Sequence, residues 1–352
     1  MKIISPTVSA LLLAIAVGWV QINQAVAAPV ESYEVVARYA IGGSGGWDFL
    51  SVDEERERLY VSRGDHVQVV DTHSGKIVGN LSETAGVHGI AVAQKLGLGF
   101  TSNGRSDSVT VFDLNTFAVV ETIGVTGANP DAILYDPTSN RVFTFNGRSA
   151  NVTAIDATTR RVVGTLAVSG KPEVAVSDGR GHVYVNIEDK NSIAVIDVTT
   201  LSVSKYWTLG SCDGPTGLAI DRQRERLFSV CNNKKMIVLD SRSGNVIKEL
   251  PIGAQVDGAA FDPELSLAFS SNGDGTVTIV KSGDAGQIAV VDTVGTQKSA
   301  RTIALDSITH RVYLPAASFA PPPPPTPEQP KPRTPMIPES FVILVLAPKT
   351  QH

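Results

Sequence analysis

An aromatic residue flanked by apolar residues recurs along the chain at a nearly constant spacing. Each time it follows a turn, in segments such as Leu59-Tyr60-Val61 and Val142-Phe143-Thr144. Successive aromatic residues lie 40 to 44 positions apart, and the series is Tyr60, Phe100, Phe143, Tyr184, Phe228, Phe269 and Tyr313. A fixed period of this length is typical of proteins built from repeated units, in which each unit packs against its neighbours.

A second series keeps the same period. In the first six repeats, an alternating strand pattern after the aromatic residue stops at Asp71, Asp113, Asp156, Asp197, Asp240 and, as a variant, Lys281. Period-2 hydrophobicity and Gly, Asn and Asp punctuation predict four short strands per repeat and no helix. In the third repeat the expected strands cover residues 132–135, 141–145, 152–155 and 162–168. Four strands per repeat indicate the blade of a β-propeller, and seven anchors predict seven blades.

The last repeat lacks its fourth strand. It begins near Ala300 and ends after a third strand pattern at 341–346, whereas an unassigned strand pattern at 33–41 precedes the first repeat. We therefore expect the N-terminal strand to complete the last blade. The predicted fold is an all-β, seven-bladed β-propeller with four-stranded antiparallel blades, and residues 28–352 form one closed domain.

The N-terminal segment, residues 1–27, has the order of a secretory signal peptide. Lys2 precedes an apolar run over 8–20, and the small-residue triplet Ala25-Val26-Ala27 follows. The alternative is an uncleaved membrane anchor, but the run is shorter than the ~20 residues that cross a bilayer. We expect cleavage before Ala28, no membrane span after cleavage, and a periplasmic or secreted protein.

Composition excludes several classes of function. The net charge of −5 lacks the electrostatic footprint of a general nucleic-acid binder. Two cysteines are too few for a disulfide framework or a cysteine-built zinc or iron-sulfur site.

Cys212 and Cys231 flank the first two strands of the fifth repeat, which predicts a disulfide in an oxidising compartment. Two free thiols remain the alternative, because the hairpin register puts Cys231 opposite roughly Thr216.

Three repeats share a further motif. It reads Phe100-Thr101-Ser102-Asn103, Phe143-Thr144-Phe145-Asn146 and Phe269-Ser270-Ser271-Asn272. The motif resembles the Tyr-Val-Thr-Asn tetrad of the YVTN-repeat β-propellers, which include the YncE-like periplasmic proteins. The resemblance covers the whole mature chain, although the other four repeats depart from the tetrad. It implies the propeller architecture and no particular chemistry, since family members are mostly without known activity.

One position in each repeat is predicted to face one end of the central channel, which we call the mouth. It lies five residues before the end of the innermost strand, and the seven repeats place Asp48, His88, Asp131, Glu173, Thr216, Asp257 and Arg301 there. The second strands are expected to end at the same mouth. Their last residues add Arg63, Asn103, Asn146 and Asn272, with Asn186 and Asn232 one residue out of register.

Carboxylate and carboxamide oxygens are the ligands that a hard cation such as Ca²⁺ prefers, and a single histidine adds a ligand for a transition metal. The mouth residues therefore predict a site for a small polar ligand or a divalent cation, which is the one cofactor that the sequence suggests. The alternative is that these Asp and Asn residues cap strand ends and turns. Arg301 opposes a metal cage that spans all seven blades and suits a carboxylate-bearing ligand better.

We expect an exported, monomeric binding or scaffold protein that binds a small polar ligand or a protein partner. The alternative is a metal-dependent hydrolase or lyase, lactonase-like, in which mouth carboxylates hold the metal and His88 or Asp131 acts as base. A redox-cofactor partner is a third class, but no haem-attachment motif supports it.

The loop 42–46 matches G-x-S-x-G, yet a strand follows it where a nucleophile elbow needs a helix.

The last repeat carries a proline-rich insertion at residues 318–340. Ten of the 18 residues in 321–338 are proline, so this run favours polyproline II and cannot join a sheet. It separates the second and third strands of the last blade, which predicts that it stands beside the mouth. Two roles stay open: a solvated spacer, or an arm that uses Lys331 and Arg333 to dock on a partner or to cover the mouth as a lid.

Overall fold

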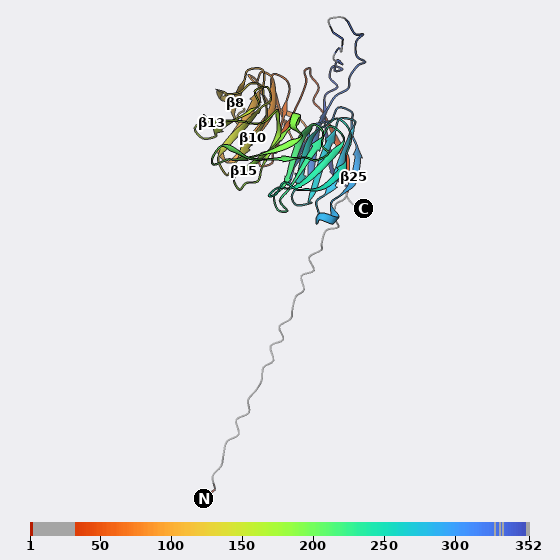
Figure 1. The fold of residues 1–352 in the computed structure, drawn as a ribbon. Coiled ribbons are helices and arrows are strands. Elements are labelled where there is room, and N and C mark those ends of the chain that lie inside the picture. The colour runs from red at the N-terminus through yellow and green to blue at the C-terminus, as the bar shows by residue number, and fades with distance from the viewer. Residues whose placement is uncertain (3–31, 327–328, 331, 333, 350–352) are drawn as a thin grey trace.

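The computed structural model describes residues 1–2, 32–326, 329–330, 332 and 334–349. Its strands form seven four-stranded antiparallel sheets arranged around a ring (Figure 1). The predicted seven-bladed β-propeller is therefore confirmed. Residues 3–27 of the predicted signal peptide, Lys331 and Arg333 lie outside the described residues. In the described part of the chain, no helix is long and apolar enough to cross a membrane.

We number the blades in chain order and give their strands from the innermost outwards. Blade 1 contains β2 (Leu50–Asp53), β3 (Arg58–Ser62), β4 (Val67–Asp71) and β5 (Ile77–Leu81). Blade 2 contains β6 (Val87–Ala93), β7 (Leu98–Asn103), β8 (Ser108–Asp113) and β9 (Val119–Gly124). Blade 3 contains β10 (Pro130–Asp136), β11 (Arg141–Asn146), β12 (Asn151–Asp156) and β13 (Arg161–Ala167).

The remaining blades follow the same plan. Blade 4 contains β14 (Pro172–Ser177), β15 (His182–Ile187), β16 (Ser192–Asp197) and β17 (Ser202–Thr208). Blade 5 contains β18 (Pro215–Asp221), β19 (Arg226–Cys231), β20 (Lys235–Asp240) and β21 (Val246–Pro251). Blade 6 contains β22 (Val256–Asp262), β23 (Leu267–Asn272), β24 (Thr276–Lys281) and β25 (Ala289–Gly295). Blade 7 contains β26 (Ala304–Asp306), β27 (Arg311–Ala316), β28 (Val342–Pro348) and β1 (Tyr33–Ala40).

The core lies between the blades. The buried apolar residues form seven clusters in the described chain, and each cluster joins two neighbouring blades. All seven repeated aromatic residues are buried in or beside these clusters, with at most 4% exposed. A blade cannot bury both of its apolar faces alone, so the repeated aromatic residue marks the surface that each blade presents to the next.

In blades 1 to 5, the repeated aspartate at the end of the third strand shapes the turn that follows. The Oδ1 atom of Asp113 accepts hydrogen bonds from the backbone N–H groups of Asn115 (2.9 Å) and Thr116 (2.8 Å). Asp156 binds the backbone of Thr158 and Thr159 in the same way. These are side-chain caps of a tight turn, which explains why the aspartate recurs with the period of the blades.

The ring is closed by the N-terminal strand, as predicted. β1 pairs antiparallel with β28 in a register that places Tyr33 opposite Pro348 and Ala40 opposite Val342. Lys349 also donates its backbone N–H to the carbonyl of Ser32 at 3.0 Å. Blade 7 thus combines three strands from the end of the chain with one from its beginning.

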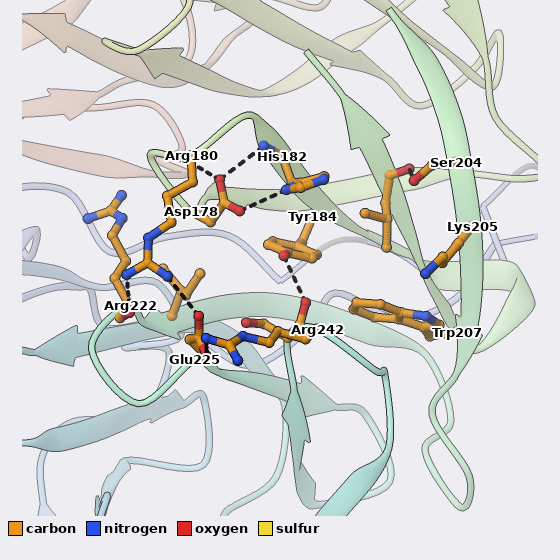
Figure 2. Close-up of a pocket in the computed structure, with 13 residues that line it drawn as sticks. Asp178, Arg180, His182, Tyr184, Ser204, Lys205, Trp207, Arg222, Glu225 and Arg242 are labelled. Carbon is orange, nitrogen blue, oxygen red and sulfur yellow. Dashed lines mark hydrogen bonds and ion pairs between the residues drawn. The ribbon is translucent and has the colours of Figure 1, made fainter. Parts of the chain in front are cut away.

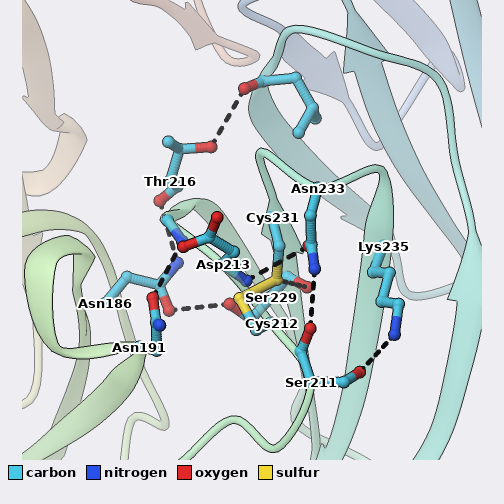
Figure 3. Close-up of a disulfide and its surroundings, with 12 residues drawn as sticks. Asn186, Asn191, Ser211, Cys212, Asp213, Thr216, Ser229, Cys231, Asn233 and Lys235 are labelled. Carbon is cyan, nitrogen blue, oxygen red and sulfur yellow. Dashed lines mark hydrogen bonds between the residues drawn. A yellow bond between two sulfur atoms is a disulfide. The ribbon is translucent and has the colours of Figure 1, made fainter.

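The interface between blades 4 and 5 has two distinctive features. A pocket opens between these blades on the face opposite the mouth (Figure 2). On the mouth face, Cys212 and Cys231 are joined by a disulfide, with Cα atoms 5.6 Å apart (Figure 3). Cys231 pairs with Pro215, one residue from the predicted Thr216. Positive φ angles at Gly210 (59°) and Gly214 (60°) bend the intervening loop back toward Cys231.

The proline-rich insertion projects from the ring between β27 and β28 (Figure 1). Its base is packed against the ring. Phe319 and Met336 form an isolated β-bridge, and the Phe319 ring lies 6.0 Å from that of Trp47. Glu339 accepts a hydrogen bond from the backbone N–H of Gly43 at 3.0 Å. The insertion therefore has an anchored base, at the mouth face of the ring, and an exposed outer part.

Candidate functional site

The structure brings the seven predicted mouth residues together. Asp48, Asp131, Glu173, Thr216, Asp257 and Arg301 line one pocket of about 550 Å³ at the centre of the ring. His88 joins them through direct contacts with Asp48 and Asp131. The residue that enters each innermost strand thus points toward a shared space, although consecutive members are more than 40 positions apart on average in the sequence.

Hydrogen bonds between blades fix the backbone of these residues. Ser271 of blade 6 donates its hydroxyl to the carbonyl of Arg301 in blade 7 at 2.5 Å. Thr302 of blade 7 donates to the carbonyl of Asp48 in blade 1 at 2.7 Å. The mouth side chains therefore project from a rim in which each blade holds the next, which is the preorganisation that a binding site needs.

Three mouth residues form a compact cluster of metal-ligand type. The Nδ1 atom of His88 lies 2.7 Å from Oδ2 of Asp48 and 3.5 Å from Oδ1 of Asp131. One ligand atom from each of the three residues lies within 4.8 Å of the others. We refer to Asp48, His88 and Asp131 as the blade 1–3 cluster.

The electrostatics of this cluster favour a proton or another cation. Burial disfavours the imidazolium, but the hydrogen bond to Asp48 and the charges of Asp131 and Glu173 outweigh it, so the pKa of His88 is raised. Burial also raises the pKa of Asp131, against the opposing effect of His88. In the absence of another cation, a proton on His88 balances part of the negative charge of the two carboxylates.

A second group of charges lies on blade 4. The Nζ atom of Lys171 lies 2.6 Å from Oε1 of Glu173 and 2.5 Å from Oε2 of Glu188, so one ammonium serves two carboxylates. Burial, together with the charge of Asp131, raises the pKa of Glu173 to about 8, although Lys171 acts in the opposite direction. Glu173 therefore takes up a proton at a higher pH than an ordinary glutamate.

Arg301 closes the ring between blades 6 and 1. Its guanidinium lies 3.1 Å from Oδ2 of Asp257 and 3.8 Å from Oδ1 of Asp48. Burial nevertheless raises the pKa of Asp257 to about 7. The Arg301 side chain is 48% exposed, so it can contact a ligand in the pocket while it stays beside Asp257.

Three predicted ligand residues do not reach the mouth. Asn103, Asn146 and Asn272 are 0% exposed. Asn146 accepts a hydrogen bond from Thr144 (3.0 Å) and donates to Thr153 (3.0 Å) in its own blade. Asn103 and Asn272 make the equivalent bonds in blades 2 and 6. These amides link the second and third strands of a blade, so the prediction that they line the mouth is corrected.

The other second-strand candidates have different positions. Arg63 is buried beneath the loop 42–46, where its guanidinium lies 3.7 Å from the centre of the Phe341 ring and donates to the carbonyl of Ser44 at 2.9 Å. Asn186 is buried and donates to the carbonyls of Thr216 (2.9 Å) and Gly217 (3.0 Å) in blade 5. Asn232, in contrast, lines the mouth pocket.

Sequence reasoning missed three polar residues that line the pocket: Lys171, Glu188 and Gln255. Lys171 and Gln255 lie two positions before Glu173 and Asp257, so the same register extended upstream identifies both. Glu188 directly follows β15 in a 3₁₀ turn, η2 (Glu188–Lys190). Its place depends on that irregular turn, for which the repeat offers no template.

A second, more apolar pocket of about 700 Å³ adjoins the mouth at the base of the proline-rich insertion. Trp47, Phe319 and Met336 line it, together with the loop 43–46. It shares Gln255 and Arg301 with the mouth pocket, so the two pockets are neighbours. A ligand in the mouth therefore has an apolar wall beside it, built partly from the insertion.

Two solved structures resemble this chain in fold. Hydrazine synthase from Kuenenia stuttgartiensis aligns over 76% of this chain and 92% of its own chain, with a TM-score of 0.68 and 17% sequence identity. The structure of U3-55K aligns over 89% of this chain and 98% of its own, with a TM-score of 0.73 and 10% identity. At these identities the similarity concerns the propeller fold alone. No family model and no curated protein sequence matches the chain.

Proposed function

We propose that this protein is an exported β-propeller binding protein of the YVTN-repeat type, whose mouth binds a divalent cation or a small polar ligand. The observation that carries the proposal is the blade 1–3 cluster, in which three ligand atoms lie within 4.8 Å of one another. The YVTN assignment is supported by the three tetrads, whose asparagines make the same hydrogen bonds in three blades.

The donor set favours a divalent transition metal such as Zn²⁺ or Mn²⁺. One imidazole and two carboxylates are common ligands of these ions, whereas Ca²⁺ prefers oxygen ligands only. Arg301 lies 3.8 Å from Asp48 on the other side of the mouth, which disfavours a cation at the channel axis. The metal would therefore be held at the side of blades 1 to 3, leaving Arg301 for an anionic group of a ligand.

The test is thermal melting of metal-free protein in the presence of Zn²⁺, Mn²⁺ or Ca²⁺. We expect Zn²⁺ or Mn²⁺ to raise the melting temperature with the logarithm of excess metal. Asp131→Asn should abolish this shift, and Asp257→Asn, a change in the same ring outside the cluster, should leave it intact. The metal assignment is wrong if no ion changes the melting temperature, or if both variants respond like the wild type.

Export is supported by the disulfide between Cys212 and Cys231, because such bonds persist mainly in oxidising compartments. We expect protein isolated from its native host to begin at Ala28 and to be found outside the cytoplasm. N-terminal sequencing after cell fractionation checks both points. A chain that retains Met1 in the membrane fraction would contradict soluble export.

A second candidate function is that of a metal-dependent hydrolase or lyase. The observation that favours it is the presence of two carboxyl groups, Glu173 and Asp257, whose pKa values of about 8 and about 7 suit proton transfer near neutral pH. Turnover of a panel of lactones by the metal-loaded protein, lost in Glu173→Gln, would support an enzyme. Metal binding without turnover of any lactone would favour a binding protein over an enzyme.

A further inference from the structure

A second candidate site lies on the opposite face of the ring, between blades 4 and 5 (Figure 2). The pocket has a volume of about 440 Å³, which is within the usual range for small-molecule sites. Residues that follow the innermost strands, such as Asp178 and Arg222, line one side, and residues of β17, such as Lys205 and Trp207, line the other. It is remote from the mouth, because these strand ends lie at the opposite face.

The pocket lies where the two flanking interfaces have an interblade arginine and this interface has a shorter side chain. In blade 3, Arg141 at the start of the second strand donates to the carbonyl of Val198 in blade 4. In blade 5, Arg226 at the same place donates to the carbonyl of Gly283 in blade 6. Blade 4 has His182 at this position, and its ring turns back to Asp178 in its own blade at 2.9 Å. The space that an arginine occupies in the flanking interfaces is therefore open.

Aromatic and aliphatic side chains form the inner wall. The rings of Tyr184 and Trp207 are stacked, with centroids 5.7 Å apart and an interplanar angle of 25°. The Tyr184 hydroxyl donates to the carbonyl of Ser241 at 2.8 Å, which holds the ring in place across the interface. Val195 and Ile220 complete this wall. Such a surface suits a planar, apolar ring.

The rim is positively charged. Four permanently basic residues line the pocket, namely Arg180, Lys205, Arg222 and Arg242, against two acids, Asp178 and Glu225. Glu225 forms ion pairs with two of these cations, at 2.7 Å from Arg180 and 2.5 Å from Arg242. Lys205 and Arg222 have no ion-pair partner within the described residues, and the Nε atom of Arg222 donates to the carbonyl of Ser177 at 2.9 Å. This surplus of positive charge occurs on a chain with a net charge of −5.

We infer that the pocket between blades 4 and 5 binds a small aromatic carboxylate, with its ring against Tyr184 and Trp207 and its carboxylate at Lys205. Guanidinium and ammonium groups form charge-assisted hydrogen bonds with carboxylates, which supplies orientation as well as affinity. The inference does not depend on the proposed metal site, because the two sites lie on opposite faces and share no residue.

The test is calorimetric titration of the purified chain with benzoate and 2-naphthoate, alongside the neutral amides benzamide and 2-naphthamide. We expect the carboxylates to bind about tenfold or more tightly than their amides. Lys205→Gln should weaken binding of 2-naphthoate by about tenfold. Lys248→Gln is the matched control, because Lys248 faces Val238 in blade 5 as Lys205 faces Val195 in blade 4.

A second variant fills the pocket without removing any lining charge. His182→Arg restores the arginine found at this position in blades 3 and 5, so it should keep the melting temperature of the wild type or raise it while it abolishes binding of 2-naphthoate. The inference is overturned if none of the four probes binds, if amides bind as well as carboxylates, or if His182→Arg and Lys205→Gln bind 2-naphthoate like the wild type.

Discussion

The Nδ1 atom of His88 lies 2.7 Å from Oδ2 of Asp48, a residue 40 positions earlier in the chain and one blade away. This contact shows how the propeller builds a site from single residues of separate blades. Each blade contributes one side chain at its inner edge, and the ring places the contributions of neighbours within hydrogen-bonding distance. The same geometry brings several titratable groups together, and two of them, Glu173 and His88, supply the first two tests.

We expect Glu173 to make the stability of the protein depend on pH between about 4.5 and about 8, its unfolded and folded pKa values. A raised folded pKa means that the folded state binds the proton more tightly. The stabilisation is therefore complete below pH 4.5 and is lost as pH rises through 8. Glu173→Gln should reduce the loss of unfolding free energy between pH 5 and 8 by about 1 to 3 kcal/mol.

Urea unfolding at the two pH values measures this effect. Glu34→Gln is a suitable control, because Glu34 is exposed on β1, away from the mouth. Identical pH dependence in Glu173→Gln and the wild type would show that Glu173 titrates normally in the folded protein.

Binding of a metal ion at the blade 1–3 cluster should release protons. Nδ1 of His88 must be deprotonated to become a ligand, and its raised pKa means that it carries a proton at higher pH than an ordinary histidine. The apparent affinity for Zn²⁺ should therefore rise with pH until His88 is deprotonated. Titration calorimetry in two buffers of different protonation enthalpy counts the protons, and a count of zero below pH 7 would contradict this ligand assignment.

Loss of the disulfide should destabilise the propeller without opening it. Cys212 and Cys231 are 19 positions apart, and closing a loop of that size contributes about 3 kcal/mol in the chain-entropy model. We expect the double variant Cys212→Ser, Cys231→Ser to lose about this amount in urea unfolding, and reduced wild-type protein to match it. Equal stability of the oxidised wild type and the double variant would argue against a structural role for the bond.

The outer part of the proline-rich insertion should be dispensable for folding. We expect a two-residue Gly-Asn turn in place of residues 321–335 to leave the melting temperature within a few degrees of the wild type. Removal that extends through Glu339 should lower the melting temperature clearly, because Met336 packs against the same apolar cluster as Trp47 and Glu339 binds the backbone of Gly43. Differential scanning calorimetry of the two deletions separates these cases, and equal loss in both would show that the outer part packs on the ring.

The buried asparagine of the tetrad should act on stability rather than on binding. Asn146→Ala removes the partner of both Thr144 and Thr153 inside blade 3, which should cost about 1 to 3 kcal/mol of unfolding free energy. Metal-induced melting shifts should be unchanged in this variant. A loss of the shift at normal stability would restore the expectation that Asn146 serves the mouth.

The fold was predictable because its signal repeats. Tyr60 and its six equivalents are buried for the same reason in every blade. An error in one predicted strand therefore does not change the predicted fold. The mouth positions were predictable for the same reason, since register alone brings Asp131 and His88 together. Register does not give the direction of a side chain, however, and Asn103 turns into its own blade although it ends a strand at the mouth.

Departures from the repeat were harder to predict. Lys171 lies in the loop just before β14, where its ammonium contacts Glu173. The position of Glu188 depends on a 3₁₀ turn. The pocket between blades 4 and 5 lies where the side chain of His182 is shorter than those of Arg141 and Arg226 and does not reach the next blade. Such a difference becomes meaningful only when the contacts of those arginines with the next blade are known.

The pairing of β1 with β28 also sets the order in which the protein can fold. β1 is the first strand of the ring to leave the ribosome, and its partner is the last. At typical synthesis rates of about 5 to 20 residues per second, the roughly 300 residues between β1 and β28 take about 15 to 60 seconds to make, and throughout that time β1 lacks its partner strand. The blades can form one after another as an open row, but the ring closes only when β28 pairs with β1. Blade 7 is therefore the last blade to form, and the ring stays open until β28 has been made.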